Sequence, residues 1–328
     1  MKHSLKEQIK GSLVRPLGFR VATGLSPTFK IPLINSVSSV PSGLVSTFTR
    51  NSTATYIDDD GILQTAGIDV PRFQNGRYLC ELAATNRFLQ SGTPATQVIT
   101  VVSGTVYTVQ CYGSGSITLS GAGTGLVVEG APITFTASST SLTCTVSGSL
   151  SRAQVETGTP ATSYIPTTTA PTDRVADVLH YAVGDVITQG QGSLYCEFVS
   201  KVANTVSKVI LCITDGTSLN RIDVYMNTAN GIKLGIIIAG VGKYVSAVRY
   251  VGSGLNKVVV TYEDNNYRLY FNGLTAGSSS DAIIVPDFNR LSVGCREAGT
   301  SQLKGEIGNI KYFKEVLTPA EAIKITTL

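Results

Sequence analysis

Between its two ends, the chain is a succession of short runs rich in valine, isoleucine, threonine and tyrosine, separated by clusters of glycine, asparagine, aspartate and serine. Such runs are typical of antiparallel strands joined by tight turns. Thr53–Ile57 and Ile62–Ala66 flank an Asp-Gly turn and predict a hairpin. Lys257–Glu263 and Tyr267–Asn272 predict a second one. Further strands are expected at Val106–Tyr112, Ser116–Leu119, Leu126–Val128, Ile133–Ala137 and Leu142–Val146. Short, numerous strands of this kind predict an all-β fold with two β-sandwich or jelly-roll domains.

Helix and linker patterns divide the chain further. Thr318 suits an N-cap, and Pro319 and Glu321 suit the first helical turn, so a short C-terminal helix is expected over 319–325. Prolines and threonines over 166–172 are typical of a linker, because proline donates no hydrogen bond to a sheet. The expected organisation is an extended N-terminal arm over 1–44, a β-sandwich over 45–166, a linker over 167–172 and a jelly roll over 173–328.

Charge is sparse and unevenly distributed. Charged residues make up 15% of the chain, against about 25% in an average soluble protein. The net charge is +4, yet residues 1–30 alone carry +5, with six lysines and arginines against one glutamate, so the remainder carries −1. A nearly neutral body argues against specific nucleic-acid binding, which needs clustered basic residues. The basic arm is expected to anchor the protein on an acidic partner surface through Lys2, Lys6, Lys10, Arg15 and Arg20.

No membrane insertion is expected, because the longest apolar run, Leu234–Val241, is far shorter than the ~20 residues that a spanning helix needs. The N-terminus lacks the uninterrupted apolar stretch of a secretory signal. The six cysteines are irregularly spaced, without a C-x-x-C pair, and are expected to be buried, reduced thiols in a protein made in the cytoplasm.

The patterns that enzymes need are missing from the sequence. His3 and His180 are the only histidines, and no G-x-S-x-G element accompanies them. No strand carries the alternating carboxylates of a sandwich-fold glycosidase, and no metal-ligand spacing or phosphate-binding loop occurs. No catalytic, cofactor or metal residues are therefore expected, and the protein is interpreted as a non-enzyme.

Polar loop tips in the C-terminal half are the candidate recognition surfaces, because loops on a rigid β scaffold commonly carry binding residues. The absence of tryptophan weakens a carbohydrate-binding interpretation without excluding it. The residues singled out are Asp215, Asn220, Asn230, Asn265, Asn266, Tyr267 and Arg296.

Several motifs occur along the first half of the chain and at the start of the second. They comprise the run from Phe48 to Gly61 (FTRNSTATYIDDDG), Pro71-Arg72-Phe73, Glu81 to Asn86, Ala153 to Gly158, Ala161 to Thr167 and Asp173 to Asp177. Together they resemble a recurrent module of tailed-bacteriophage virion proteins. The segment after them resembles a concanavalin A-like, laminin-G-like jelly roll, through Tyr267–Gly273 and the closing Gly305–Phe313. The resemblance implies a fibre, spike, neck or tail appendage, or head decoration, often trimeric, and implies no catalytic residues.

The leading hypothesis is a virion structural protein, assembled in the bacterial cytoplasm and attached by its N-terminal arm to a portal, collar, tail or capsid. Its sandwiches then contact the host surface, through a glycan or a protein, or another virion protein, and a homotrimer is favoured. The alternatives are a glycan-degrading enzyme on a jelly-roll fold and a carbohydrate-binding lectin or adhesin. Fold alone does not separate these functions.

Overall fold

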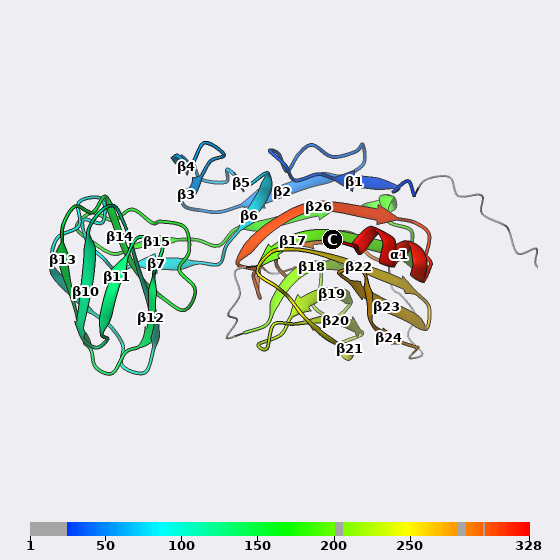
Figure 1. Cartoon of the computed structure of the whole chain (residues 1–328). Coiled ribbons are helices and arrows are strands. Elements are labelled where there is room, and N and C mark those ends of the chain that lie inside the picture. Colours follow the sequence, from blue (N-terminus) through cyan, green and yellow to red (C-terminus); the bar gives the residue numbers. More distant parts are fainter. Residues whose placement is uncertain (1–24, 201–205, 281–286, 298) are drawn as a thin grey trace, which may run out of the picture.

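The computed structural model describes residues 25–200, 206–280, 287–297 and 299–328, and its regular secondary structure is almost entirely strands. Figure 1 shows two lobes, a jelly roll and a smaller sandwich, joined by a pair of strands. The predicted all-β class with jelly-roll architecture is confirmed. The proposed anchoring residues Lys2, Lys6, Lys10, Arg15 and Arg20 lie outside the described residues.

The jelly roll consists of two facing antiparallel sheets, here called sheet A and sheet B. Sheet A runs in the order β24 (Leu274–Ser279), β23 (Asn266–Phe271), β22 (Leu255–Glu263), β17 (Gln191–Ser200), β26 (Gly305–Phe313), β6 (Arg77–Cys80) and β5 (Arg72–Gln74), with β1 (Phe29–Ile31) also on β26. Sheet B runs in the order β2 (Val45–Thr49), β16 (Val178–Ala182), β25 (Arg290–Val293), β18 (Lys208–Thr214), β19 (Arg221–Met226), β20 (Gly231–Ile238) and β21 (Val241–Tyr250). A short 3₁₀ turn, Gly184–Val186, follows β16.

Alternation along these strands builds the core between the two sheets. In β19, for example, Ile222, Val224 and Met226 are buried and face sheet A, while the intervening residues face outward. Leu194 and Phe198 of β17 join the same apolar cluster from the opposite sheet. The core is therefore a continuous layer between sheets, as expected for a jelly roll.

The smaller lobe is inserted into the jelly roll between β6 and β16. Its sheets are β11 (Gly125–Val128), β10 (Ser116–Gly121), β13 (Ser141–Ser147) and β8 (Gln97–Thr100), and β12 (Ile133–Thr136), β9 (Val106–Tyr112) and β14 (Arg152–Thr157). It has its own apolar cluster, which includes Val109, Ile117 and Val155. The pair β7 (Ala84–Asn86) and β15 (Thr172–Arg174) forms its stem, and the hairpin β3 (Ala54–Ile57) and β4 (Leu63–Ala66) lies beside the junction (Figure 1).

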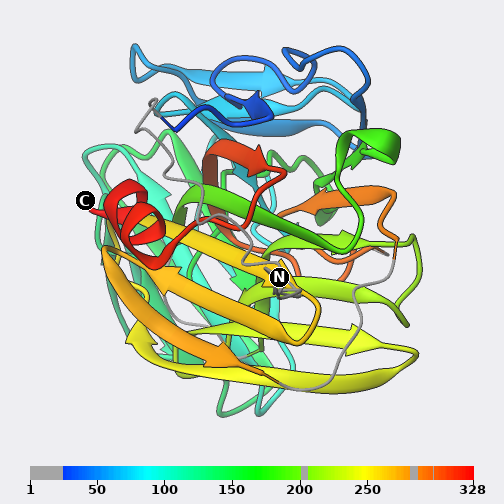
Figure 2. The ribbon, with the colours of Figure 1, turned by 90° about the vertical axis from the view of Figure 1, so that its right-hand side faces the viewer.

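Strand pairing crosses the domain boundaries expected from the sequence. β2 pairs with β16, and β6 pairs with β26, so the segment before the insertion supplies strands to the jelly roll. β1 also pairs with β26, and Phe29, Ile31 and Leu33 are buried, so residues 29–33 do not belong to a free arm. Figure 2 shows these N-terminal strands along one side of the jelly roll. The prolines that flank β1 argued against a strand at this position, because proline has no backbone N–H to donate. They are tolerated here because β1 pairs with a neighbouring strand on one side only.

The helix α1 (Pro319–Thr326) confirms the predicted C-terminal helix. Thr318 and Glu321 form the expected capping box, and Pro319 occupies the first turn. The helix packs on the outer face of sheet A, where Ala322 joins Tyr195 and Val259 (Figure 2). The described residues contain no helix of the length and apolar character that crossing a bilayer requires. All six cysteines are buried and free.

Candidate functional site

Three of the predicted recognition residues lie in turns at the ends of sheet B strands. Asp215 and Asn220 belong to the turn between β18 and β19, where the Asp215 carboxylate accepts hydrogen bonds from Asn220 Nδ2 and the Thr217 amide, both at 2.8 Å. Asn230 lies in the next turn, with a φ of 58°. The Asp215 carboxylate is thus engaged within its own loop, and Asn220 Oδ1 accepts from the Ala239 amide in the turn between β20 and β21 at 2.9 Å.

A second group occupies the hairpin between β22 and β23 of sheet A. Asn265 adopts a φ of 63°, and Asn266 donates to Glu263 Oε1 at 2.6 Å. The assignment of Tyr267 to a recognition surface is wrong, since its side chain is fully buried in the core between the sheets. The alternation of β23 turns Tyr267 inward, together with Leu269. Asn265 and Asn266 therefore lie at a sheet A hairpin, whereas Asp215, Asn220 and Asn230 lie in turns of sheet B.

Arg296 instead lies over the outer face of sheet B, beside a row of residues aligned across its strands. In register, this row consists of Thr47, His180, Ser292, Cys212, Asp223, Gly235 and Tyr244. Asp223, which sequence reasoning missed, accepts from Arg296 Nε at 2.9 Å and from Arg221 Nε at 3.3 Å. Alternation along β19 was the signal that places Arg221 and Asp223 on one face.

The Asp223 carboxylate is fully buried beneath its two arginines. Burial raises its pKa, an effect that Arg296 and Arg221 oppose. Gly235 is required opposite it, because a Cβ there would lie 2.1 Å from Asp223 Oδ1. The arrangement orients Arg296 on the sheet surface, and the one carboxylate offsets one of the two guanidinium charges.

His180 lies further along the same row. Its Nδ1 is 3.0 Å from Ser292 Oγ, and burial, with a contribution from Arg290, lowers its pKa to about 4. The imidazole is therefore neutral near pH 7. Among the described residues, no three or more His, Cys, Asp or Glu side chains are gathered as ligands for a metal ion.

The motif residues of the N-terminal half converge into one buried ion-pair network, here called the junction network. Asp177 accepts from Arg50 Nη1 at 2.9 Å and from Arg72 Nη2 at 2.5 Å. Glu81 accepts from Arg72 Nη1 at 2.9 Å and from Arg174 Nη1 at 2.7 Å. All five side chains are at most 1% exposed. They tie the first strands of the jelly roll to the stem of the inserted sandwich.

Asn86, the last residue of the Glu81 motif, extends this connection. Its Oδ1 accepts from the amides of Phe88 and Val155 at 3.0 Å, and its Nδ2 donates to the Ile165 carbonyl at 2.8 Å. A buried side chain with both ends bonded to backbone fixes the path of three separate segments. The motif residues thus hold the two lobes together.

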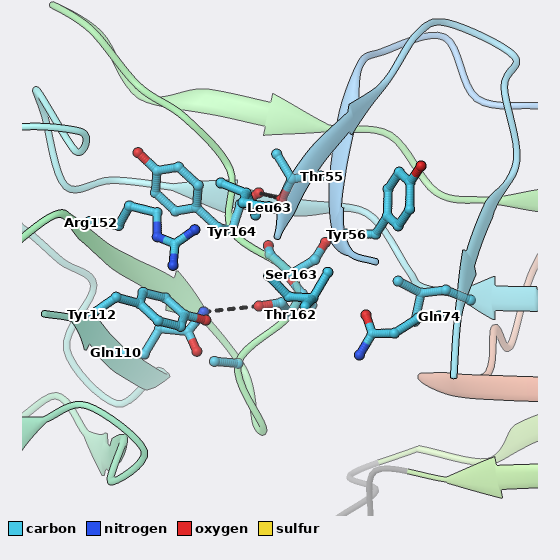
Figure 3. Close-up of a pocket in the computed structure, with 13 residues that line it drawn as sticks. Thr55, Tyr56, Leu63, Gln74, Gln110, Tyr112, Arg152, Thr162, Ser163 and Tyr164 are labelled. Carbon is cyan, nitrogen blue, oxygen red and sulfur yellow. Dashed lines mark hydrogen bonds between the residues drawn. The ribbon is translucent and has the colours of Figure 1, made fainter. Parts of the chain in front are cut away.

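A cleft of about 170 Å³ opens beside this network, between the β3–β4 hairpin and the inserted sandwich (Figure 3). Tyr56 and Gln74 come from the jelly-roll side, and Gln110, Tyr112 and Arg152 come from β9 and β14. The loop over 161–164 forms the wall between them. Its carbonyl at Thr162 accepts from Gln110 Nε2 at 2.9 Å. We call this space the junction cleft.

Arg152 is the one cation among the residues that line the junction cleft. Its guanidinium carbon lies 4.4 Å from the ring centre of Tyr112 and 5.8 Å from that of Tyr164, and Figure 3 shows it between the two rings. Burial raises the pKa of Tyr112, which keeps its hydroxyl protonated and able to donate. Sequence reasoning missed this site, because its residues are far apart in the chain and come together only through the insertion.

Comparison with known families identifies one domain. Residues 198–322 match the family model described as the concanavalin A-like lectin/glucanases superfamily, Laminin_G_3. A domain of this superfamily is therefore present, and the matched segment covers the later strands of the jelly roll. A search of curated proteins found no match.

Solved structures with similarity to this chain cover less than half of it. The sialidase CBM40 of Ruminococcus gnavus, bound to α2,3 sialyllactose, is 19% identical, with a TM-score of 0.37 over 43% of this chain and 84% of that one. A leech intramolecular trans-sialidase is 18% identical, with a TM-score of 0.37 over 43% of this chain and 24% of that one. A heptameric pentraxin from Limulus polyphemus is 15% identical, with a TM-score of 0.35 over 42% and 70%.

Proposed function

We propose that this protein is a non-enzymatic structural protein of a tailed-bacteriophage virion that binds carbohydrate in the junction cleft. The virion assignment rests on the motif resemblance. Its residues Arg50, Arg72, Glu81, Arg174 and Asp177 do not lie scattered on the surface but form the network that joins the two lobes. The lectin/glucanase description of the family that matches residues 198–322 supports carbohydrate as the ligand class, and the position of the site rests on the cleft itself, which that segment does not line.

The junction cleft is the observation that carries the proposal. Binding sites for small ligands are concave, with apolar or aromatic walls and a few directed polar groups. Here the rings of Tyr56, Tyr112 and Tyr164 supply the walls, and the amides of Gln74 and Gln110 supply donors and acceptors suited to sugar hydroxyls. The volume of about 170 Å³ is below the roughly 300–1,000 Å³ of drug-sized sites. The cleft therefore suits a single sugar unit.

In this proposal the basic residues Lys2 to Arg20 attach the protein to a portal, collar, tail or capsid protein, and the chain assembles as a homotrimer in the host cytoplasm. Deletion of residues 1–20 is then expected to leave the purified protein folded and to abolish its incorporation into particles. Particle composition, measured by mass spectrometry after complementation, tests this. Normal incorporation of the shortened chain would contradict the attachment role.

Binding of the purified full-length protein to a panel of bacterial surface polysaccharides tests the carbohydrate role. Tyr112→Ala is expected to weaken binding about tenfold or more, because the ring forms a wall of the cleft. Tyr244→Ala is the matched control, since Tyr244 is 60% exposed on the outer face of sheet B. Loss of binding in Tyr244→Ala alone would move the site to sheet B. An absence of any saccharide binding would contradict the function.

The same incubation tests the non-enzymatic assignment. The outer face of sheet B carries Asp223, but this carboxylate is fully buried and ion-paired with Arg221 and Arg296, which are not the surroundings of an accessible catalytic acid. No release of reducing ends from the bound polysaccharide is expected. Release that disappears in Asp223→Asn, in a protein that remains folded, would establish the glycan-degrading alternative.

A further inference from the structure

Arg152 lacks the carboxylate partner that other arginines of this molecule have. Within the described part of the chain, no acidic side chain lies within ion-pair distance of its guanidinium, and its Nε is buried without a hydrogen-bond acceptor. Its contacts are the rings of Tyr112 and Tyr164. Aromatic faces attract a cation but accept few of its hydrogen bonds. The guanidinium is thus held in place with donors left over.

The charge behind the cleft has the same sign. The junction network contains three guanidiniums and two carboxylates, so one buried positive charge remains uncompensated by side chains of the network. Ser163, which lines the cleft, accepts from Arg72 Nη1 at 2.7 Å and from Arg174 Nη1 at 2.9 Å. Glu156, the nearby buried acid, is paired with Lys304 at 3.8 Å. The network charge therefore favours an anion beside Ser163, whereas the charge of Glu129, which raises the pKa of Tyr112, opposes one.

We infer that the junction cleft binds an acidic sugar unit, with Arg152 pairing the carboxylate of the ligand. This inference rests on the proposed carbohydrate function. The planar fork of arginine matches a carboxylate in a bidentate arrangement, and ring stacking fixes the plane of that fork before the ligand arrives. Tyr56 and Gln74 lie on the wall opposite Arg152, and Gln110 lies beside Tyr112 on the same side as Arg152. In this inference these three side chains bind the sugar hydroxyls.

Titration calorimetry of the full-length protein with D-glucuronate and D-galacturonate, against D-glucose and D-galactose, tests the inference. Each pair differs in the group at C6, a carboxylate in place of a hydroxymethyl. The uronates are expected to bind about tenfold or more tightly than the neutral sugars, as a charge-assisted pair requires. Their affinity is expected to fall with added salt, while that of the neutral sugars remains constant.

Arg152→Gln is expected to reduce uronate affinity about tenfold or more, to the level of the neutral sugar. Arg268→Gln is the matched control, because it removes the same charge from β23, at the far side of the jelly roll, where Arg268 bonds to Asn266. Arg152→Lys keeps the charge but removes the fork, and is expected to restore part of the affinity. Unfolding curves of all three variants show that the comparison is between folded proteins.

Other outcomes overturn the inference in distinct ways. Neutral sugars that bind as tightly as uronates, unaffected by Arg152→Gln, would reject the acidic ligand while retaining the carbohydrate function. No binding of any saccharide would reject both. Inorganic phosphate that binds as tightly as the uronates, and displaces them, would reduce the cleft to a general anion site.

Discussion

The junction network and the junction cleft lie side by side, and their arginines have opposite environments. Arg50, Arg72 and Arg174 are buried and each contacts a carboxylate within 2.9 Å. Arg152 is partly exposed, lies between two tyrosine rings and has no acidic partner among the described side chains. The first three arginines use their charge to hold two lobes together. The fourth keeps its charge available at the surface.

This difference separates structural from ligand-binding arginines within one small region. A buried guanidinium without a counterion is strongly unfavourable, so the network arginines and their acids depend on one another. Arg152 avoids that cost because it is partly solvated and because its guanidinium stacks on two tyrosine rings. This stacking is weaker than a buried ion pair. Substitutions in the network are therefore expected to act on stability, and those at Arg152 on binding.

Arg72→Ala is expected to produce the largest effect. It removes the one arginine that contacts both Asp177 and Glu81, and leaves two buried carboxylates with one partner each. Breaking such a buried pair costs about 3–5 kcal/mol. Urea unfolding of the full-length protein measures this loss.

Arg152→Ala is the matched control for the network. It is expected to lower the free energy of unfolding by only about 1 kcal/mol or less, because its guanidinium has no ion pair to lose. Equal destabilisation by the two variants would mean that the cleft arginine is as structural as the network, and would remove the basis of the comparison.

Asp223 provides an intermediate case on the outer face of sheet B. Its arginines are 12% and 26% exposed, against at most 1% for the arginines of the junction network. Arg296→Ala is expected to cost about 1–3 kcal/mol, since the buried Asp223 carboxylate loses its closer partner. In an Asp223→Asn background the same change is expected to cost less, because the uncompensated charge is gone. A double-mutant cycle of unfolding free energies measures the difference.

His180 predicts how this face responds to pH. Its pKa is lowered to about 4 in the folded chain, against about 6.5 when unfolded. Between these values the unfolded chain binds more protons, so stability falls as the pH is lowered from 6.5 to 4. Because the ring is partly exposed, the loss is expected to be about 1–2 kcal/mol.

His180→Gln is expected to reduce this slope, leaving the contribution of the carboxyl groups. The neighbours that face the ring are Ser292 and Arg290 on β25 and Thr47 on β2, and none of them carries a carboxyl or imidazole group. Unfolding curves at pH 7, 5.5 and 4 supply the comparison. Identical slopes for the variant and the parent would show that another group controls the acid response.

Local patterns predicted the hairpins and the C-terminal helix, because their partners are close in sequence. The hairpin of β3 and β4 is set by its Asp-Gly turn, and α1 by the capping box of Thr318. Local patterns did not predict that β1 and β6 would pair with β26 in sheet A of the jelly roll. Their partner β26 lies more than 200 residues later in the chain.

The functional residues were harder to predict for the same reason. Tyr267 was misplaced because a turn tip and an inward-facing strand residue are adjacent in sequence. Arg152 stood out in no motif, since its environment is made by Tyr112 from one strand and Tyr164 from a later loop. A single sequence gives strand alternation and turn positions, but not which distant strands meet.

Loss of the stacking between Arg152 and Tyr112 is expected to change the free energy of unfolding least of all. It therefore distinguishes this pair most clearly from the ion pairs of the junction network. At a ring-to-guanidinium distance of 4.4 Å, a partly exposed cation–π pair contributes about 0.5–1 kcal/mol. A double-mutant cycle of Arg152→Gln with Tyr112→Leu, followed by urea unfolding, isolates that coupling. If each single variant loses uronate binding while the coupling free energy of unfolding stays this small, Arg152 and Tyr112 belong to the ligand site. A coupling as large as that of Arg72 with Asp177 would instead assign the pair to the structural network.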